Sequence, residues 1–176
     1  MAQESTMKDI DVLVIGGGIA GTLAALKAKE AGASKIVIVD KGYTGNSGMA
    51  AFGAGHLWVY IPGEDNLEDQ FRSTVRALGW LAQQDVIGDH FERVYGVVQD
   101  MENCGAEFEK TPDGKWERTL GRGKALGMRF HGPQMMESIA RAVKKRGIEL
   151  VRHTMVTDLL VNNGSVRRRS GSHCRS

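Results

Sequence analysis

Residues 10–41 constrain the fold of this chain more than any other stretch. Residues 10–15 form a short apolar run rich in β-branched side chains, which predicts a buried parallel strand. A glycine-rich turn over residues 16–21 follows, and a helical pattern then runs through Ala31 and stops at Gly32. Residues 35–40 predict a second strand that ends in an acid, Asp40. This order predicts a parallel strand–helix–strand unit in an α/β fold.

The turn fits the pattern G-x-G-x-x-G, in which each glycine has a physical task. The first permits a tight turn, the second lets a pyrophosphate approach the backbone, and the third lets helix and strand pack closely. The helix N-terminus offers free N–H groups to that pyrophosphate. The acid is placed to bind a ribose diol, which favours FAD or NAD over NADP and leaves FAD and NAD open. The pattern predicts a Rossmann-like domain whose candidate contacts are Gly16, Gly18, Ile19, Ala20, Gly21 and Asp40.

Composition narrows the class of protein. The chain of 176 residues, 41% hydrophobic and 25% charged, is typical of one soluble globular domain. It has no continuous apolar run of membrane-span length and no signal-peptide pattern at its start, so we expect a cytoplasmic protein without direct membrane insertion. Its two cysteines, Cys104 and Cys174, are too few for a disulfide framework or a metal site.

The net charge of +2 comes from the end of the chain. The last ten residues hold Arg167, Arg168, Arg169 and Arg175 and no acid. The remainder of the chain carries slightly more acidic than basic residues. No basic face with interleaved aromatic residues accompanies this cluster, so the sequence does not predict a nucleic-acid partner.

A second glycine-rich stretch, residues 41–63, follows the acid. Small residues dominate it, yet Met49 and Phe52 are apolar and would be out of place in a solvated linker. We therefore expect a loop that closes over a large cofactor. A nicotinamide-binding domain would normally continue directly to another helix and strand, so this loop argues against an NAD-dependent dehydrogenase, which stays a second alternative.

At this loop the sequence resembles a known family. Residues 15–21, the pair Asp40-Lys41 and the run 47–53 are similar to the FAD-binding N-terminus of succinate dehydrogenase/fumarate reductase flavoproteins. The Ser-Gly-x-x-Ala-x-Gly form resembles the alpha subunit of adenylylsulfate reductase. The resemblance implies a glutathione reductase-like FAD/NAD(P)-binding fold. In the succinate dehydrogenase branch a histidine is joined covalently to FAD, and Ser47 stands in its place, which implies non-covalent FAD. The further residues that the resemblance assigns to FAD are Lys41, Asn46, Ser47, Gly48, Ala50, Ala51, Gly53, Ala54, Gly55 and, against the adenine, Val156.

The rest of the chain predicts alternating elements. The patterns indicate helices over residues 67–78 and 85–103, a hairpin over 108–119 with Phe108 packed across from Trp116, and a basic glycine-rich loop over 121–132. A helix beginning at Pro133 and strands near 148–151 and 155–161 complete it. We expect a flexible N-terminus over 1–8, an FAD-binding domain over 9–166 that is incomplete at its C-terminus, and a disordered basic tail over 167–176.

The resemblance implies the FAD-binding portion of a flavin-dependent oxidoreductase that exchanges electrons with an iron–sulfur or quinone-linked partner. The family's substrate-binding segments follow the part that this chain resembles, so no catalytic residue is named. A truncated, inactive fragment or an interaction module stays an alternative. An unfinished sheet has an open edge, which leaves association into a homo-oligomer open as well.

Overall fold

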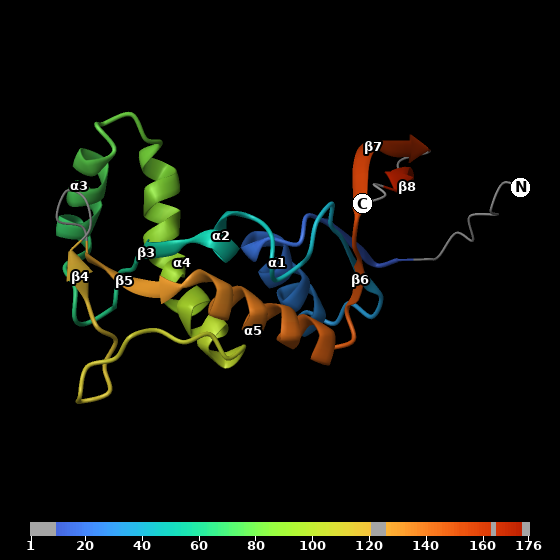
Figure 1. The fold of residues 1–176 in the computed structure, drawn as a ribbon. Helices are drawn as coiled ribbons and strands as arrows, with labels where there is room; N and C mark the ends of the chain where they lie inside the picture. The colour runs from blue at the N-terminus through green and yellow to red at the C-terminus, as the bar shows by residue number, and fades with distance from the viewer. Residues whose placement is uncertain (1–9, 121–125, 163–164, 174–176) are drawn as a thin grey trace, which may run out of the picture. The chain divides into compact units, whose positions relative to one another are not determined.

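The computed structural model describes residues 10–120, 126–162 and 165–173 (Figure 1). It is a mixed α/β protein that divides into two compact units, Met1–Ala51 with Ile139–Ser176, and Phe52–Ser138. The sequence indicated one domain over residues 9–166. Two units arise because the chain leaves its parallel sheet after the second strand and returns to it only through the last helix. The predicted flexible N-terminus, residues 1–8, lies outside the described residues.

A parallel sheet organises the first unit. Its strands are β1 (Val12–Ile15), β2 (Ile36–Val39) and β6 (Glu149–Val151), in the order β1-β2-β6. Helix α1 (Ile19–Glu30) connects β1 to β2. Every residue of the central strand β2 is buried, as its unbroken Ile-Val-Ile-Val sequence predicts. The parallel sheet predicted from residues 10–40 and 148–151 is confirmed.

Asp11 anchors the start of β1 to the segment before β2. Its carboxylate accepts hydrogen bonds from the backbone N–H groups of Lys35 and Ser34, each 2.8 Å long. These two bonds, Lys35 first, hold the pKa of Asp11 below its usual value. Because both bonds favour the ionised form, they lower the free energy of the folded state only while the carboxylate is charged.

The pKa shift of Asp11 predicts a specific pH dependence. A depressed pKa in the folded state contributes stability above the unfolded-state pKa, and this contribution is lost as the pH falls through the folded-state pKa. Asp11→Asn should therefore be less stable than the native chain at neutral pH and equally stable in strong acid. Urea unfolding of both proteins across this pH range measures the difference. A gap that stays constant with pH would contradict the assignment.

A two-stranded antiparallel ribbon follows β6. It consists of β7 (Thr154–Asn162) and β8 (Ser165–His173), with register irregularities near Val156. Residues 167–173 thus form a strand, where the sequence indicated a disordered tail, and residues 174–176 lie outside the described part. Backbone pairing needs no alternation of apolar side chains, which explains why this polar segment carries no strand signal in its sequence.

Helix α5 (Gly132–Lys145) carries the predicted buried stripe. The stripe is formed by Met135, Met136, Ile139, Ala140 and Val143, all buried. The helix begins at Gly132, one residue before the predicted Pro133, and Gly147 just beyond its end has a φ of +72°. Arg146 then forms an ion pair of 2.8 Å with Glu30 at the end of α1.

The second unit contains the helices α3 (Leu67–Ala77) and α4 (Gln84–Asn103) and an antiparallel sheet. The side chain of Asn66 caps α3 by accepting from the N–H of Asp69 over 3.1 Å, which confirms the predicted start. The sheet has the order β3-β5-β4, with β3 at Ala54–Trp58, β5 at Leu126–His131 and β4 at Thr119–Leu120. The short helix α2 (Met49–Phe52) precedes β3 and spans the boundary between the units.

Two stretches that the sequence indicated as loops are partly strands. Strand β3 lies within residues 41–63, and β5 lies within residues 121–132. A Cβ added to Gly55 would lie 2.6 Å from the ring of Phe130 across the pair, so the glycine makes room for the aromatic side chain. Glycine-rich composition hides such strands because the stabilising contacts come from a distant partner.

Isolated backbone bridges define the pairing in the predicted hairpin, and the side-chain packing of Phe108 across from Trp116 stays a prediction. Lys110 pairs with Trp116, whereas Phe108 pairs with Phe130. The ring of Trp116 lies 5.7 Å from that of Tyr95, between ring centres. The turn at residues 111–114 is confirmed, but the partner of each aromatic residue depends on elements distant in sequence.

Candidate cofactor site

The glycine-rich turn joins β1 to α1 in the first unit. Gly16 has a φ of +101°, and its N–H donates to the carbonyl of Val39 over 2.8 Å. A Cβ added to Gly21 would overlap the carbonyl oxygen of Gly16 and approach Val14 Cγ1 to 3.1 Å. The turn and the first turn of α1 therefore pack so closely that only glycine fits at residue 21.

Gly18 is the N-cap of α1, and the N-terminus of this helix carries no side-chain cap. The first turn contains no acidic residue. The first N–H groups of a helix have no partner within the helix and carry partial positive charge. A Cβ added to Gly18 would meet no atom within 4 Å, so the backbone at this N-terminus borders open space. This geometry suits an anion that approaches the main chain, beside Ile19, Ala20 and Gly21.

Gly17 is a site residue that the sequence motif missed, because it occupies a variable position of the pattern. The residue is buried, and a Cβ here would overlap both Thr44 Oγ1 and Asp40 Oδ2. Only the unbroken run Gly16-Gly17-Gly18 could have signalled this requirement. Gly17 thus allows the loop after β2 to lie directly against the glycine-rich turn.

Asp40 lies at the C-terminal end of β2, and its side chain is buried. Its carboxylate accepts hydrogen bonds from the Gly42 N–H (3.1 Å) and the Thr44 hydroxyl (3.2 Å). Its backbone is fixed on both sides, since its N–H donates to Val151 and its carbonyl accepts from Thr154. An ionised carboxylate offers about four acceptor positions, so two hydrogen bonds leave capacity for a ligand hydroxyl.

The loop after Asp40 turns back toward the glycine-rich turn. Gly45 and Gly48 have φ values of +96° and +92°. A Cβ added to Gly48 would lie 4.0 Å from Gly18 Cα. The Ser47 hydroxyl donates to the Tyr43 carbonyl over 2.7 Å. The structure therefore brings Gly48 to the glycine-rich turn, while Ser47 bonds within its own loop. Of the other predicted loop residues, Lys41 and Asn46 are exposed, Ala50 is half-buried and Ala51 is buried.

The remaining predicted contacts lie elsewhere in the chain. Gly53 precedes β3, and Ala54 and Gly55 begin it, so all three belong to the second unit. Val156 lies on β7, half-buried, two residues after the Thr154 N–H that donates to the Asp40 carbonyl over 3.0 Å. Strand β7 thus starts at the C-terminal end of β2, next to the acid.

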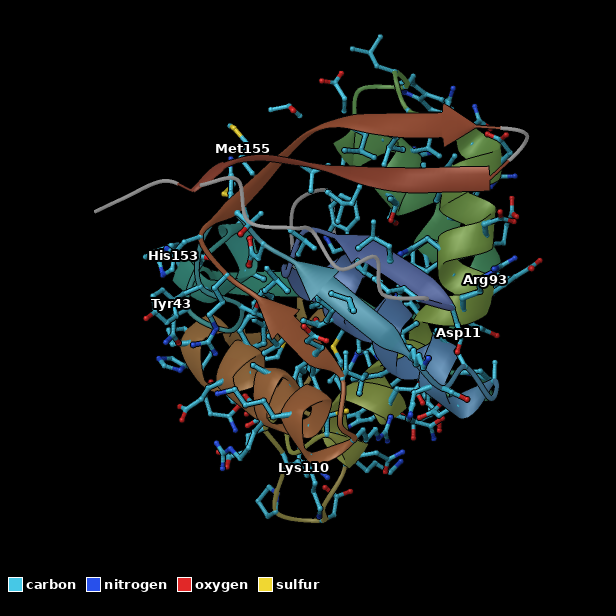
Figure 2. The ribbon with its side chains drawn as sticks, turned by 90° about the vertical axis from the view of Figure 1, so that its right-hand side faces the viewer. Asp11, Tyr43, Arg93, Lys110, His153 and Met155 are labelled. Carbon is cyan, nitrogen blue, oxygen red and sulfur yellow. The ribbon has the colours of Figure 1, made fainter. Side chains whose placement is uncertain are left out.

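An aromatic and cationic group beside Asp40 was also missed. The rings of Tyr43 and His153 lie 4.8 Å apart in an edge-to-face arrangement, and Figure 2 labels both. The guanidinium of Arg152 lies 4.8 Å from the centre of the Tyr43 ring, on the cation–π scale. The sequence could not reveal this group, because the connection between β6 and β7 meets the loop after β2 only in the folded chain.

These residues fit a dinucleotide cofactor. The N-terminus of α1, which follows three glycines and has no side-chain cap, suits a pyrophosphate. The buried carboxylate of Asp40, at the end of the neighbouring strand β2, has acceptor capacity left for a ribose diol. Within the described ranges, no group of three or more His, Cys, Asp or Glu side chains could hold a metal ion. Nor does any helix in those ranges have the length and hydropathy needed to cross a membrane.

Comparisons with known proteins agree with this geometry. The family described as "FAD binding domain" matches residues 11–171. The chain is 30% identical over 171 residues to one of the subunits of the fumarate reductase (CoM/CoB) of Methanothermobacter marburgensis, covering 93% of this chain and 31% of that protein.

Two solved structures show the same fold. A quinol fumarate reductase of E. coli superimposes with a TM-score of 0.79 at 26% identity, over 90% of this chain and 28% of that one. The adenylylsulfate reductase of Archaeoglobus fulgidus gives 0.71 at 31% identity, over 93% and 27%. The chain thus spans less than a third of these relatives.

The match to the family extends five residues beyond residue 166, where the sequence resemblance ended, and so includes part of β8. It covers most of the chain and includes the turn, the acid and the loop that form the candidate site. The chain therefore belongs to the FAD binding domain family.

Proposed function

We propose that the chain holds FAD non-covalently in a Rossmann-like, glutathione reductase-like domain. The observation that carries the proposal is the open N-terminus of α1 at Gly18, one strand away from the buried Asp40. The order β6-β2-β1 with a helical connection between β1 and β2 supports the fold assignment, since doubly wound nucleotide-binding sheets have the order 3-2-1 in this half.

In this proposal the pyrophosphate of FAD accepts hydrogen bonds from the backbone of residues 18–21. Asp40 accepts from the ribose, and its hydrogen bonds to Gly42 and Thr44 fix the orientation of the carboxylate. The start of β7, which includes Val156, would border the adenine. The loop residues Lys41, Asn46, Ser47, Gly48, Ala50 and Ala51 would face the rest of the cofactor. Gly53, Ala54 and Gly55 are assigned to the flavin from the sequence resemblance.

Non-covalent attachment rests on Ser47. Its hydroxyl already donates to the Tyr43 carbonyl, and serine lacks the imidazole that forms the covalent bond in the succinate dehydrogenase branch. Bound FAD would supply hydride or electron transfer. The chain's own residues would hold and orient it, since the N–H groups would bind its pyrophosphate and Asp40 the adjacent ribose of the adenosine.

The parent activity in this proposal is that of a flavin-dependent oxidoreductase. The names of relatives describe fumarate reductase and adenylylsulfate reductase, and one is named as a subunit of a larger assembly. Electron exchange with an iron–sulfur partner is the corresponding proposal for this chain. No residue is assigned to substrate, because relatives with different substrates share this portion.

The test is flavin retention by the purified chain. We expect flavin absorption bands, with the pigment released into the supernatant after acid precipitation. Asp40→Asn should weaken FAD binding about tenfold, because an amide replaces the charged acceptor of the ribose. Fluorescence titration of the stripped protein measures this, with the exposed Asp113→Asn as the matched control.

Other results would contradict the proposal. Pigment that stays with the precipitate would refute non-covalent attachment. A chain that binds NAD and not FAD would favour the dehydrogenase alternative. A chain that binds neither, with no rise in melting temperature on adding FAD, would leave an inactive fragment or interaction module.

A further inference from the structure

The first unit contains a cavity away from the glycine-rich turn. It is a depression largely open to solvent, with a volume of about 430 Å³, and it is lined by Lys144, Ile148, Leu150 and Arg152. These residues come from the last turn of α5 and from strand β6 with its immediate neighbours, along the outer edge of the described sheet. It is large enough for a small ligand to rest against, with one side of that ligand exposed to solvent.

Two cations line this space. Among the described residues, neither Lys144 nor Arg152 forms an ion pair, whereas the neighbouring Arg146 is paired with Glu30. The acid of β6, Glu149, is not among the residues that line the cavity. The lysines in the last turn of α5 interact favourably with the helix dipole. Lys144 also places its charge at a cavity.

The side chain of Arg152 is partly fixed by its contact with Tyr43. Its guanidinium lies 4.8 Å from the centre of the Tyr43 ring, and the residue is half-buried. A guanidinium that already rests on an aromatic ring loses less side-chain freedom when it binds a ligand. Its planar donors suit two oxygens of one phosphate, while the ammonium of Lys144 adds a second positive charge.

We propose that this cavity binds an organic phosphate monoester. The phosphate would lie between the Lys144 ammonium and the Arg152 guanidinium, and the apolar body of the ester would contact Ile148 and Leu150. A phosphate monoester carries close to two negative charges at neutral pH, which matches the two cations. The aliphatic wall gives an ester an advantage over free phosphate. None of the four residues that line it is proposed to contact FAD, although Arg152 rests on Tyr43 in the loop after Asp40, and the proposal goes beyond that function.

The test uses phenyl phosphate in isothermal titration calorimetry. We expect saturable binding by the native chain, and binding of inorganic phosphate and of benzoate at least about fivefold weaker. Lys144→Gln and Arg152→Gln should each weaken phenyl phosphate about tenfold, because each removes a charge-assisted hydrogen bond. Lys145→Gln is the matched control, since this neighbouring cation does not line the cavity and should leave the affinity unchanged.

Four results would overturn the proposal. One is the absence of saturable phenyl phosphate binding by the native chain. Another is equal affinity in Lys144→Gln and Lys145→Gln, and the third is benzoate binding as tightly as phenyl phosphate. Binding that disappears in Gly18→Val but survives Lys144→Gln would place the phosphate at the glycine-rich turn and also contradict it. Flavin retention, measured on the same samples, tests the FAD proposal independently.

Discussion

Gly18→Val is expected to reduce FAD affinity by about 100-fold or more while leaving the fold intact. In the protein alone, an added Cβ at residue 18 meets nothing within 4 Å, and its φ of −74° suits any residue. A side chain there would fill the space in which a pyrophosphate reaches the helix N–H groups. Loss of two hydrogen bonds to a charged ligand corresponds to this magnitude.

Measuring the free energy of unfolding of Gly18→Val shows whether its lost FAD affinity is a direct effect on binding or a result of unfolding. Valine instead of glycine at an N-cap should change the free energy of unfolding by no more than about 1 kcal/mol. Gly18→Ala should fall between the native chain and Gly18→Val in FAD affinity, because its side chain is smaller. Fluorescence titration with FAD and urea unfolding measure the two quantities. Unchanged FAD affinity in Gly18→Val would refute the assignment of the pyrophosphate to this turn.

Gly21→Ala is expected to destabilise the fold itself. The new Cβ would overlap the Gly16 carbonyl oxygen, which belongs to the backbone and cannot rotate away as a side chain could. Relief requires α1 to move from β1, so we expect a loss of about 3 kcal/mol or more, a large share of a typical domain's stability. FAD affinity would fall as a consequence of the displaced turn.

Gly88→Ala provides the matched control for this substitution. Gly88 lies inside α4, and a Cβ there would meet no atom within 4 Å, so the same chemical change should stabilise by about 0.5–1 kcal/mol. Urea unfolding of both variants gives the comparison. Destabilisation of both by the same amount would show that the loss at residue 21 is not caused by packing against Gly16.

The chemistry of the turn was predictable from sequence because its causes are local. The strand, the three glycines of the motif and the terminal Asp40 lie within one continuous segment, and each acts through its own backbone or side chain. The starts of α3 and α5 were similarly predictable to within one residue, from the cap at Asn66 and from Pro133. The resemblance at residues 47–53 then predicted the family, which the comparisons confirm.

Tertiary structure decided what depends on residues distant in sequence. Gly17 is required because Thr44 and Asp40 press against it, and Tyr43 meets Arg152 and His153 only when β6 lies beside β2. Strands β3 and β5 pair with each other across a long stretch of sequence, and β8 is too polar for its sequence to predict a strand. The cavity beside Lys144 has the same origin. A sequence specifies which groups a chain carries, and long-range packing determines which of them meet.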